Sequence, residues 1–361
     1  MEMVEKKGKQ GAYINKKAGR NSGIELLRIL SLFMIFWMHG AASAYENTFG
    51  EVSGILIEVI GNMGVACFIL ISGYYGIRLN VKKMMHLDLM LVFFSWLGLL
   101  MQFVWGNQVG GETILSYLLP VIGRQSWYFT CYFALAFLSP FLNEMVEKMG
   151  ERRLKQLLVT MLVIFSAVTT VFFFDINEDG GKGMVHMTML YLIGRYLGVY
   201  QSEKVYETKK LAKVFFVTAG MNFALNAALY LVSGSVQNRY ARDNSLFTII
   251  QAVCVFLIFR NIYFENEFVN RLAKHVPAAF IFEWTMRVAI VTYVYNYLVC
   301  ADKWYYVMVT FAIAVVLIAI GSAIDWLRIA VLHKPETWLV DKIYSLGEKS
   351  RLLEWMKRKI W

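Results

Sequence analysis

The chain has 361 residues, of which 58% are hydrophobic and 17% charged, and its formal net charge at pH 7 is +10. A soluble domain carries about 45–50% apolar and about 25% charged residues, so the composition argues against a soluble protein. The basic residues recur between hydrophobic runs and do not gather in one segment, which argues against nucleic acid as a partner.

Hydrophobic runs of about 20 residues, the length that a helix needs to cross a ~30 Å hydrocarbon core, follow one another along the chain. Helices satisfy their own backbone hydrogen bonds in lipid, so we expect an all-α, polytopic transmembrane helical bundle. The apolar stretch 113–123 is too short to span and is expected to be re-entrant or interfacial. About ten spans are predicted, at residues 23–44, 53–77, 84–105, 126–144, 156–174, 184–200, 211–232, 245–263, 276–298 and 303–324.

Three parts of the chain are predicted from this pattern. Residues 1–22 form a basic cytoplasmic segment, residues 23–324 form the membrane domain, and residues 325–361 form a basic, Trp-rich tail. Such a tail is expected to lie in the cytoplasmic interface of the bilayer, attracted to anionic lipid. Lys and Arg are concentrated in the segments that this map places inside, so both termini are expected in the cytoplasm of a multi-pass plasma-membrane protein.

The sequence contains no signature of a metal site or of a bound cofactor. The four cysteines lie in or at the ends of the spans without metal-ligand spacing, and are expected to be reduced core thiols. Phosphate-loop, nucleophile-elbow and zinc-binding motifs do not occur either. We therefore expect neither a metal nor a permanently bound cofactor.

Two ionisable residues stand out in the first span, where charged side chains are costly and often functional. Arg28 and His39 are eleven residues apart, so they lie within about 20° of each other on one helix face and roughly 16 Å apart along the axis. Arg28 would lie near the cytoplasmic side and His39 near the outer side. In a purely structural interpretation, Arg28 reaches the lipid headgroups beside Glu25, and His39 is an interfacial histidine.

The second span carries another polar face. Glu58 and Asn62 are one turn apart, and Ser72 follows on the same face. Glu58 could orient His39, or it could anchor one helix to another by a hydrogen bond. Ser72, beside a glycine, is typical of a kink or a packing contact.

Three motifs, which follow one another along the chain, resemble motifs of the acyltransferase 3 family of membrane acyltransferases. The resemblance covers about residues 20 to 325. In that family an Arg near the start of the first helix precedes a His by eleven positions, an apolar run closes in Ser-Gly-Tyr or Ser-Gly-Phe, and a Trp-Phe stretch precedes a Pro-ended helix. A weaker similarity is found at 191–195. The matching residues are Arg28 with Trp37-Met38-His39, then Ser72-Gly73-Tyr74, and then Ser126-Trp127-Tyr128-Phe129 with Ser139-Pro140.

The chain departs from the family in a late helix. Many relatives carry a His where this chain has Glu283. Glu283 and Arg287 are four residues apart, in the favourable order for an ion pair on one helix. The pair could be a buried structural contact or part of a substrate channel.

The resemblance implies transfer of an acyl group, often acetyl, from cytosolic acyl-CoA as donor substrate to a hydroxyl of an extracytoplasmic glycan or glycolipid. The expected partners are these two substrates, the lipid bilayer and glycan-assembly proteins. A transporter or flippase of lipid-linked saccharides and a polyprenyl-dependent glycosyltransferase remain as alternatives. The candidate site residues are His39 as general base with Glu58, Arg28 and Arg195 for the donor, and Asn62, Ser72, Trp127, Glu283 and Arg287 along the channel.

Overall fold

A computed structural model describes residues 20–42, 48–106, 109–291, 294 and 303–348. Its regular elements are all helices in these ranges, so the all-α prediction is confirmed. Eight of the described helices are long and apolar enough to cross a membrane. The predicted basic segment 1–22 and the end of the tail lie almost wholly outside the described residues, and the position of the termini stays a prediction.

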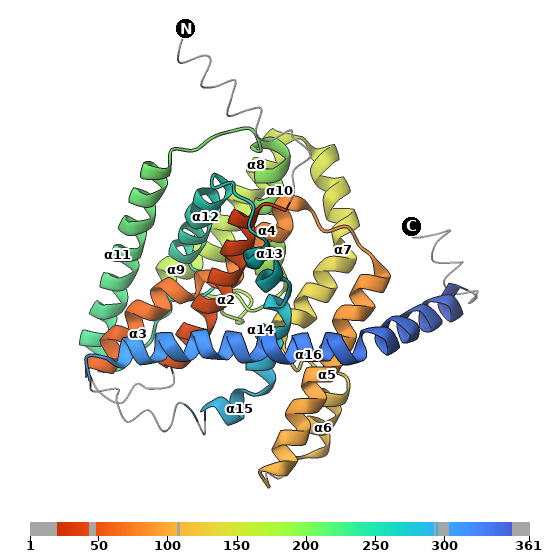
Figure 1. Cartoon of the computed structure of the whole chain (residues 1–361). Helices are drawn as coiled ribbons and strands as arrows, with labels where there is room; N and C mark the ends of the chain where they lie inside the picture. The colour runs from red at the N-terminus through yellow and green to blue at the C-terminus, as the bar shows by residue number, and fades with distance from the viewer. Residues whose placement is uncertain (1–19, 43–47, 107–108, 292–293, 295–302, 349–361) are drawn as a thin grey trace.

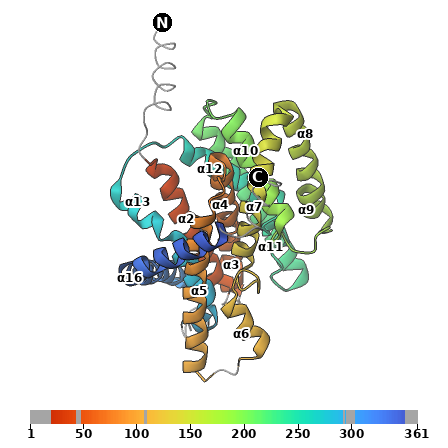
Figure 2. The same cartoon turned by 90° about the vertical axis from the view of Figure 1, so that its right-hand side faces the viewer.

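The helices are arranged around a buried centre formed by α4 and α10 (Figure 1). In both views α5 and α6 project together from one end of the molecule (Figures 1 and 2). The α-helices are α2 (Ser22–Ala42), α3 (Thr48–Gly61), α4 (Met63–Tyr75), α5 (Val81–Val104), α6 (Gly111–Leu118), α7 (Trp127–Met149), α8 (Glu151–Leu162), α9 (Val168–Phe172), α10 (Met184–Tyr200), α11 (Thr208–Ser233), α12 (Leu246–Arg260), α13 (Glu267–Lys274), α14 (Val276–Thr285), α15 (Arg287–Ile290) and α16 (Tyr306–Glu348), with a π-helix, η1 (Val163–Ala167), and a 3₁₀ helix, η2 (Arg239–Ala241).

Glycines bring α4 and α10 into close contact. A Cβ atom on Gly73 would lie 2.3 Å from the carbonyl oxygen of Tyr191, and one on Gly194 would lie 2.5 Å from that of Leu70. Small residues let the backbones of membrane helices approach closely, which gives packing contacts without a hydrophobic driving force. The glycines of the Ser-Gly-Tyr motif and of the 191–195 motif therefore serve helix packing.

Two predicted spans are broken. The second is divided at Asn62 into α3 and α4, and the Asn62 side chain donates a hydrogen bond from Nδ2 to the carbonyl oxygen of Ala241, at 2.6 Å. The predicted span 276–298 is divided at Met286, whose φ of −92° and ψ of 4° end α14. Hydrophobicity alone predicts neither break, because the apolar run continues through both positions.

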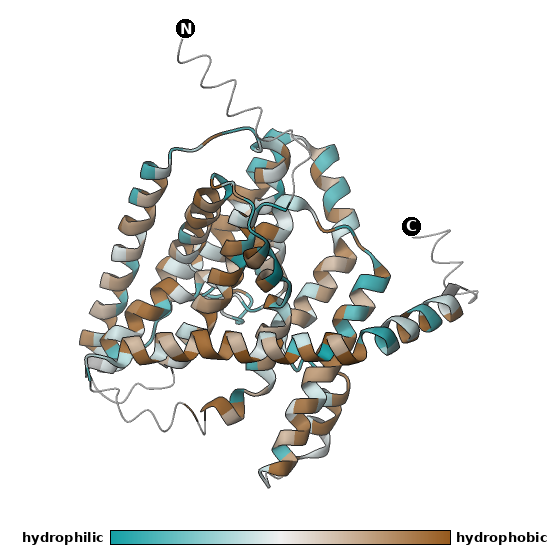
Figure 3. Cartoon of the chain, in the orientation of Figure 1, coloured by the Kyte–Doolittle hydropathy of each residue, from teal (hydrophilic) through white to brown (hydrophobic). Residues whose placement is uncertain are grey.

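The last helix is longer than predicted. α16 has 43 residues and continues without a break through Pro335, so the polar tail up to Glu348 extends the helix that begins in the predicted last span. It lies across the other helices in Figure 1, and hydrophobic residues follow most of its length in Figure 3. Asp325 fixes it to α13, accepting hydrogen bonds from His275 at 2.7 Å and from Arg328 at 2.9 Å.

Candidate active site

Two pockets meet inside the bundle, one around Arg28 and one around His39. The Arg28 pocket has a volume of about 450 Å³ and the His39 pocket one of about 910 Å³. The Arg28 pocket is lined by Arg20, Arg28, Phe68, Ser72, Leu87, Tyr128, Phe129, Tyr132, Ala273, Lys274, Val276, Pro277 and Phe280. The His39 pocket is lined by Ile35, Met38, His39, Glu58, Asn62, Val65, Trp127, Phe173, Phe174, Asp175, Glu178, Asp179, Gly180, Lys182, Gln237, Asn238, Arg242, Asp243, Phe280, Trp284 and Arg287.

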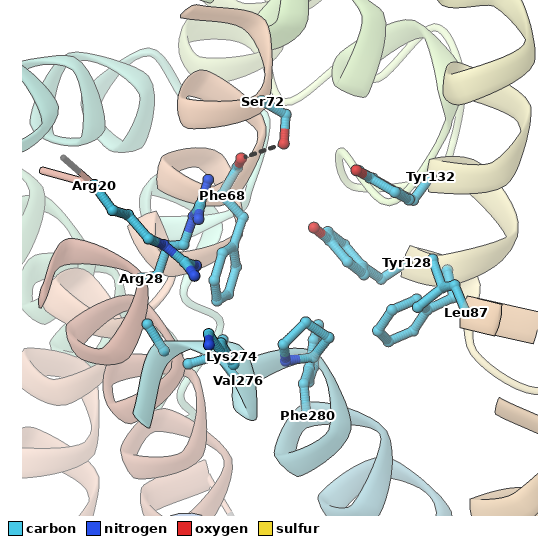
Figure 4. A pocket seen from close by; sticks show the side chains of 13 residues that line it. Arg20, Arg28, Phe68, Ser72, Leu87, Tyr128, Tyr132, Lys274, Val276 and Phe280 are labelled. Atoms are coloured by element: carbon cyan, nitrogen blue, oxygen red, sulfur yellow. Dashed lines mark hydrogen bonds between the residues drawn. The ribbon is translucent and has the colours of Figure 1, made fainter. Parts of the chain in front are cut away.

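The Arg28 pocket is cationic on one side. Nη1 of Arg28 lies 2.9 Å from Oε1 of Glu25, and Nε of Arg20 lies 2.7 Å from the same oxygen. One carboxylate thus holds two guanidinium groups beside each other, and Lys274 from the end of α13 adds a third cation. Figure 4 shows the three basic side chains on one side of the pocket. Arginine pairs well with phosphate because its planar group donates two parallel hydrogen bonds.

The opposite wall of the Arg28 pocket is aromatic. Tyr128 and Tyr132, one turn apart on α7, are stacked with ring centroids 6.1 Å apart. Their hydroxyl groups point toward the basic side in Figure 4. Ser72 lies between the two walls and donates a hydrogen bond to the carbonyl oxygen of Phe68, at 2.9 Å. The pocket therefore offers cations at one wall and rings at the other, a lining that suits an extended ligand with a phosphate end.

His39 lies at the wall of the larger pocket, in contact with a buried carboxylate. Its Nδ1 atom lies 3.1 Å from Oε1 of Glu283, and Glu283 is completely buried, with 0% of its surface exposed. An ionised carboxylate only accepts hydrogen bonds, so with Glu283 ionised Nδ1 carries the proton and Nε2 is the basic nitrogen. A carboxylate on the far nitrogen orients an imidazole and stabilises its protonated form, as in the Ser-His-Asp triad.

Aromatic rings separate the two pockets. Phe280 on α14 lines both of them and is 5% exposed. Its ring is stacked on that of Phe68 with centroids 6.3 Å apart, and lies 5.1 Å from that of Tyr128. Arg28 and His39 belong to the same helix but line different pockets, and these aromatic rings lie between the two.

The predicted site residues fall into three groups. Ser72 lies with Arg28, whereas Glu58, Asn62, Trp127 and Arg287 lie with His39. Arg195 lines neither of these two pockets: its guanidinium packs against Gly76, at the end of α4.

Glu283 has His39, and not Arg287, as its direct partner, although the charge of Arg287 still acts on it from a longer distance. The helix ends at Met286, between the two residues, so they do not share a face. Glu283 contacts His39, and the Arg287 guanidinium lies 5.4 Å from the centre of the Trp284 ring. Arg287 therefore makes a cation–π contact beside the pocket, and the carboxylate serves the histidine.

Sequence reasoning missed the other two cations of the Arg28 pocket. Arg20 and Lys274 lie outside the predicted spans, and only polar residues within spans were singled out. They meet because α13 packs on the start of α2, where Ser22 Oγ donates to Asn270 Oδ1 at 2.9 Å and accepts from the backbone N–H of Asn266 at 2.8 Å. The sequence indicates their role only weakly, because basic residues at the ends of apolar runs are common in membrane proteins.

Comparison with known proteins places the chain in a family. No curated protein and no solved structure matches it. A protein-family model of the acyltransferase 3 family, described as an acyltransferase domain, matches residues 21–326, which include both pockets apart from Arg20. The chain belongs to the acyltransferase 3 family, and it is a membrane acyltransferase.

Proposed function

We propose that the protein transfers an acyl group, acetyl in the first instance, from cytosolic acyl-CoA to a hydroxyl of an extracytoplasmic glycan at the plasma membrane. The observation that supports this most is the meeting of two unlike pockets at Phe280. One has three cations, and the other has a histidine held by a buried carboxylate. A phosphate-bearing donor cannot cross lipid, so donor and acceptor need separate entrances that meet at the reacting atoms.

The Arg28 pocket binds the donor in this proposal. Arg20, Arg28 and Lys274 contact the phosphates of acyl-CoA, for which guanidinium groups are well suited. The uncharged pantetheine arm lies along the aromatic wall formed by Tyr128 and Tyr132. The arm carries the thioester toward Phe280.

The thioester reaches His39 past the aromatic partition. Phe280 lines both pockets, and in this proposal its side chain turns when the arm enters. A closed partition in the absence of donor keeps water and small solutes from crossing. When the donor is bound, the pantetheine arm itself fills the opening and keeps water away from the thioester.

His39 acts as the general base. Its Nε2 takes the proton of the acceptor hydroxyl while the oxygen attacks the thioester carbonyl carbon. The C–O bond forms, the C–S bond breaks, and the imidazolium returns the proton to the leaving thiolate, so free CoA and an O-acyl ester result. Glu283 holds the ring and offsets the positive charge during the step.

The His39 pocket suits a polyhydroxylated acceptor. Its lining combines two indole rings, Trp127 and Trp284, with the polar side chains of Glu58 and Asn62. Flat rings can cover the apolar faces of a sugar, and carboxylate and amide groups can bind its hydroxyls. Its volume of about 910 Å³ is twice that of the Arg28 pocket, which is consistent with an acceptor bulkier than the pantetheine arm.

Binding of acetyl-CoA to the purified full chain in detergent tests the proposal. Isothermal titration calorimetry should give saturable binding with one site. Dephospho-CoA and pantetheine, which lack some or all of the phosphates, should compete progressively more weakly. A folded protein that does not bind acetyl-CoA would contradict the proposal. That result is the one expected of a saccharide transporter or a polyprenyl-dependent glycosyltransferase.

A further inference from the structure

Three aliphatic side chains of the His39 pocket take no part in the proposed reaction. Ile35 and Met38 come from α2, and Val65 comes from α4. Ile35 is 1% exposed and Val65 is 7% exposed, so the pocket wall is formed here by the protein core. The rest of the lining consists of aromatic rings, a glycine and polar side chains, most of them between α9 and α10 or between α11 and α12. The pocket therefore has one aliphatic wall, which these three residues form.

Val65 lies where the two pockets approach each other. It is one turn before Phe68 on α4, and residues three apart on a helix point to the same side. Val65 lines the His39 pocket, whereas Phe68 lines the Arg28 pocket and is stacked on the ring of Phe280, with centroids 6.3 Å apart. Val65 is thus the first α4 residue of the His39 pocket beyond these two rings.

Ile35 has the corresponding place on α2. It follows Arg28 by seven residues and precedes His39 by four, so the three side chains share one helix face. Along the axis Ile35 lies roughly 10 Å from Arg28 and roughly 6 Å from His39. A donor arm that brings its thioester from the Arg28 pocket to His39 therefore passes Ile35.

Close helix packing holds the aliphatic wall in place. A Cβ atom on Gly64 of α4 would lie 2.8 Å from Cγ1 of Ile35, and one on Gly61 of α3 would lie 2.5 Å from Cβ of Met38. The two side chains thus lie directly on glycines and have no room to retreat toward α3 and α4. Val65 is stiff as well, because branching at its Cβ atom restricts the χ1 angle.

We propose that Ile35, Met38 and Val65 form the acyl subsite and restrict the donor to short, unbranched acyl chains, of which acetyl fits best. This inference rests on the proposed function and adds to it the residues that select the acyl group. The thioester carbonyl carbon lies at His39 with its sulfur on the side of Phe280, and the acyl chain lies against the aliphatic wall. Apolar groups gain free energy where they leave water for such a surface.

A longer acyl chain finds no further apolar surface. Beyond the aliphatic wall the lining is charged, with carboxylates from Asp175, Asp179 and Asp243. The indole rings of Trp127 and Trp284 cover the acceptor sugar in the proposed reaction. A chain that extended past the wall would lie among the carboxylates or displace the acceptor, so each added methylene lowers the rate of transfer.

The test compares acetyl-, propionyl- and butyryl-CoA as donors. Each labelled donor is supplied to opened membrane vesicles that carry the full chain and their surface glycans, and alkali-labile label on the glycans is measured. One methylene in an apolar pocket changes kcat/KM by about 10–200-fold. The wild type should therefore use propionyl-CoA at least about tenfold less well than acetyl-CoA, and butyryl-CoA less well still.

Variants of the wall should change this preference in both directions. Val65→Ala and Ile35→Ala enlarge the subsite, and each should raise the butyryl-to-acetyl ratio of kcat/KM about tenfold or more, a gain that a misfolded protein cannot imitate. Val65→Ile adds a methylene and should lower the propionyl-to-acetyl ratio. Val59→Ala, at a buried valine of α3 that lines neither pocket, is the matched control and should keep the wild-type ratios.

The inference is overturned if the wild type transfers butyryl as well as acetyl, or if Val65→Ala and Ile35→Ala both transfer acetyl with the wild-type ratios. In either case acetyl-CoA is still bound and used, so the proposed function stands. Failure of the proposed function gives a different result, because the wild type then neither binds acetyl-CoA nor labels the glycans with any of the donors. That result would overturn the acyl subsite together with the reaction.

Discussion

The imidazole of His39 on α2 and the carboxylate of Glu283 on α14 are 3.1 Å apart, although 244 residues separate them in the chain. Only 12% of the His39 side chain and 1% of that of Glu283 are exposed. The contact joins the two helices at the larger pocket. It is the basis of the proposed base function, because it fixes the ring and assigns its two nitrogens different roles.

Replacing His39 by Ala should abolish acyl transfer. General-base catalysis contributes about 10²–10⁴ in rate, and the turnover number should fall by at least the lower figure while the protein still inserts and elutes as a single species. His333→Ala, an exposed histidine on α16, is the control and should retain full activity. Transfer at the wild-type rate by His39→Ala would rule out the base.

Glu283→Gln should reduce the turnover number by about 10²–10⁴, as loss of an orienting carboxylate does in related sites, and leave the KM for donor unchanged. Glu283→Asp should recover part of the rate. The double variant with His39→Ala should be no slower than His39→Ala alone, because the two residues act as a unit. Additive losses would show that Glu283 acts apart from His39.

Phe280→Trp should slow transfer without weakening donor binding, since a larger ring at the partition obstructs the thioester and leaves the cations in place. Phe280→Ala should raise hydrolysis of acetyl-CoA in the absence of acceptor, because it opens the partition to water. The measurements are release of free thiol and calorimetric binding of CoA. If both variants behave like the wild type, the thioester takes another route.

Substitutions of Arg28 and Arg195 should affect the KM for acetyl-CoA differently, although the sequence predicts donor binding for both residues. Arg28→Ala should raise the KM for acetyl-CoA about tenfold or more, in line with the loss of a charge-assisted hydrogen bond of about 1.5–3 kcal/mol, with a smaller effect on turnover. Arg195→Met should leave that KM unchanged, because Arg195 lines neither pocket. Equal effects of the two variants would place the donor elsewhere.

Asp325→Asn should destabilise the protein strongly. The carboxylate is buried and accepts from His275 and Arg328, and breaking such a buried network by removing one partner costs about 3–5 kcal/mol. The melting temperature should fall by several degrees. Asp341→Asn on the same helix breaks an exposed pair with Lys82 and should change it little. An equally small effect of Asp325→Asn would contradict the role given to this network.

Much of the fold follows from the sequence because a bilayer constrains helices so strongly. Long apolar runs predict the helical membrane bundle, and the eleven-residue spacing places Arg28 and His39 on one helix. The breaks at Asn62 and Met286 do not follow, because each lies within a continuous apolar run. The one at Asn62 carries a hydrogen bond to Ala241, which is 179 residues away in the chain.

Site residues could be predicted from the sequence only where an ionisable side chain lies in an apolar segment, because burying such a group in lipid is energetically costly. His39, Glu58 and Glu283 stand out as ionisable residues within apolar segments, and each therefore needs a partner or a pocket. Which partner it has is set by helix packing, so the sequence suggests the local residue Arg287 for Glu283, whereas the direct contact in the structure is with His39. Phe280 gives no signal at all, because a phenylalanine in an apolar helix is ordinary until two pockets are found on either side of it.

The most direct test of the account uses sealed right-side-out membrane vesicles that carry their surface glycans and enclose labelled acetyl-CoA. Alkali-labile label should appear on the outer glycans of vesicles with the wild type or with His333→Ala, and should be absent from those with His39→Ala. Label that appears with His39→Ala at the wild-type rate, or only when acetyl-CoA is supplied outside, would contradict transfer from a cytosolic donor by His39.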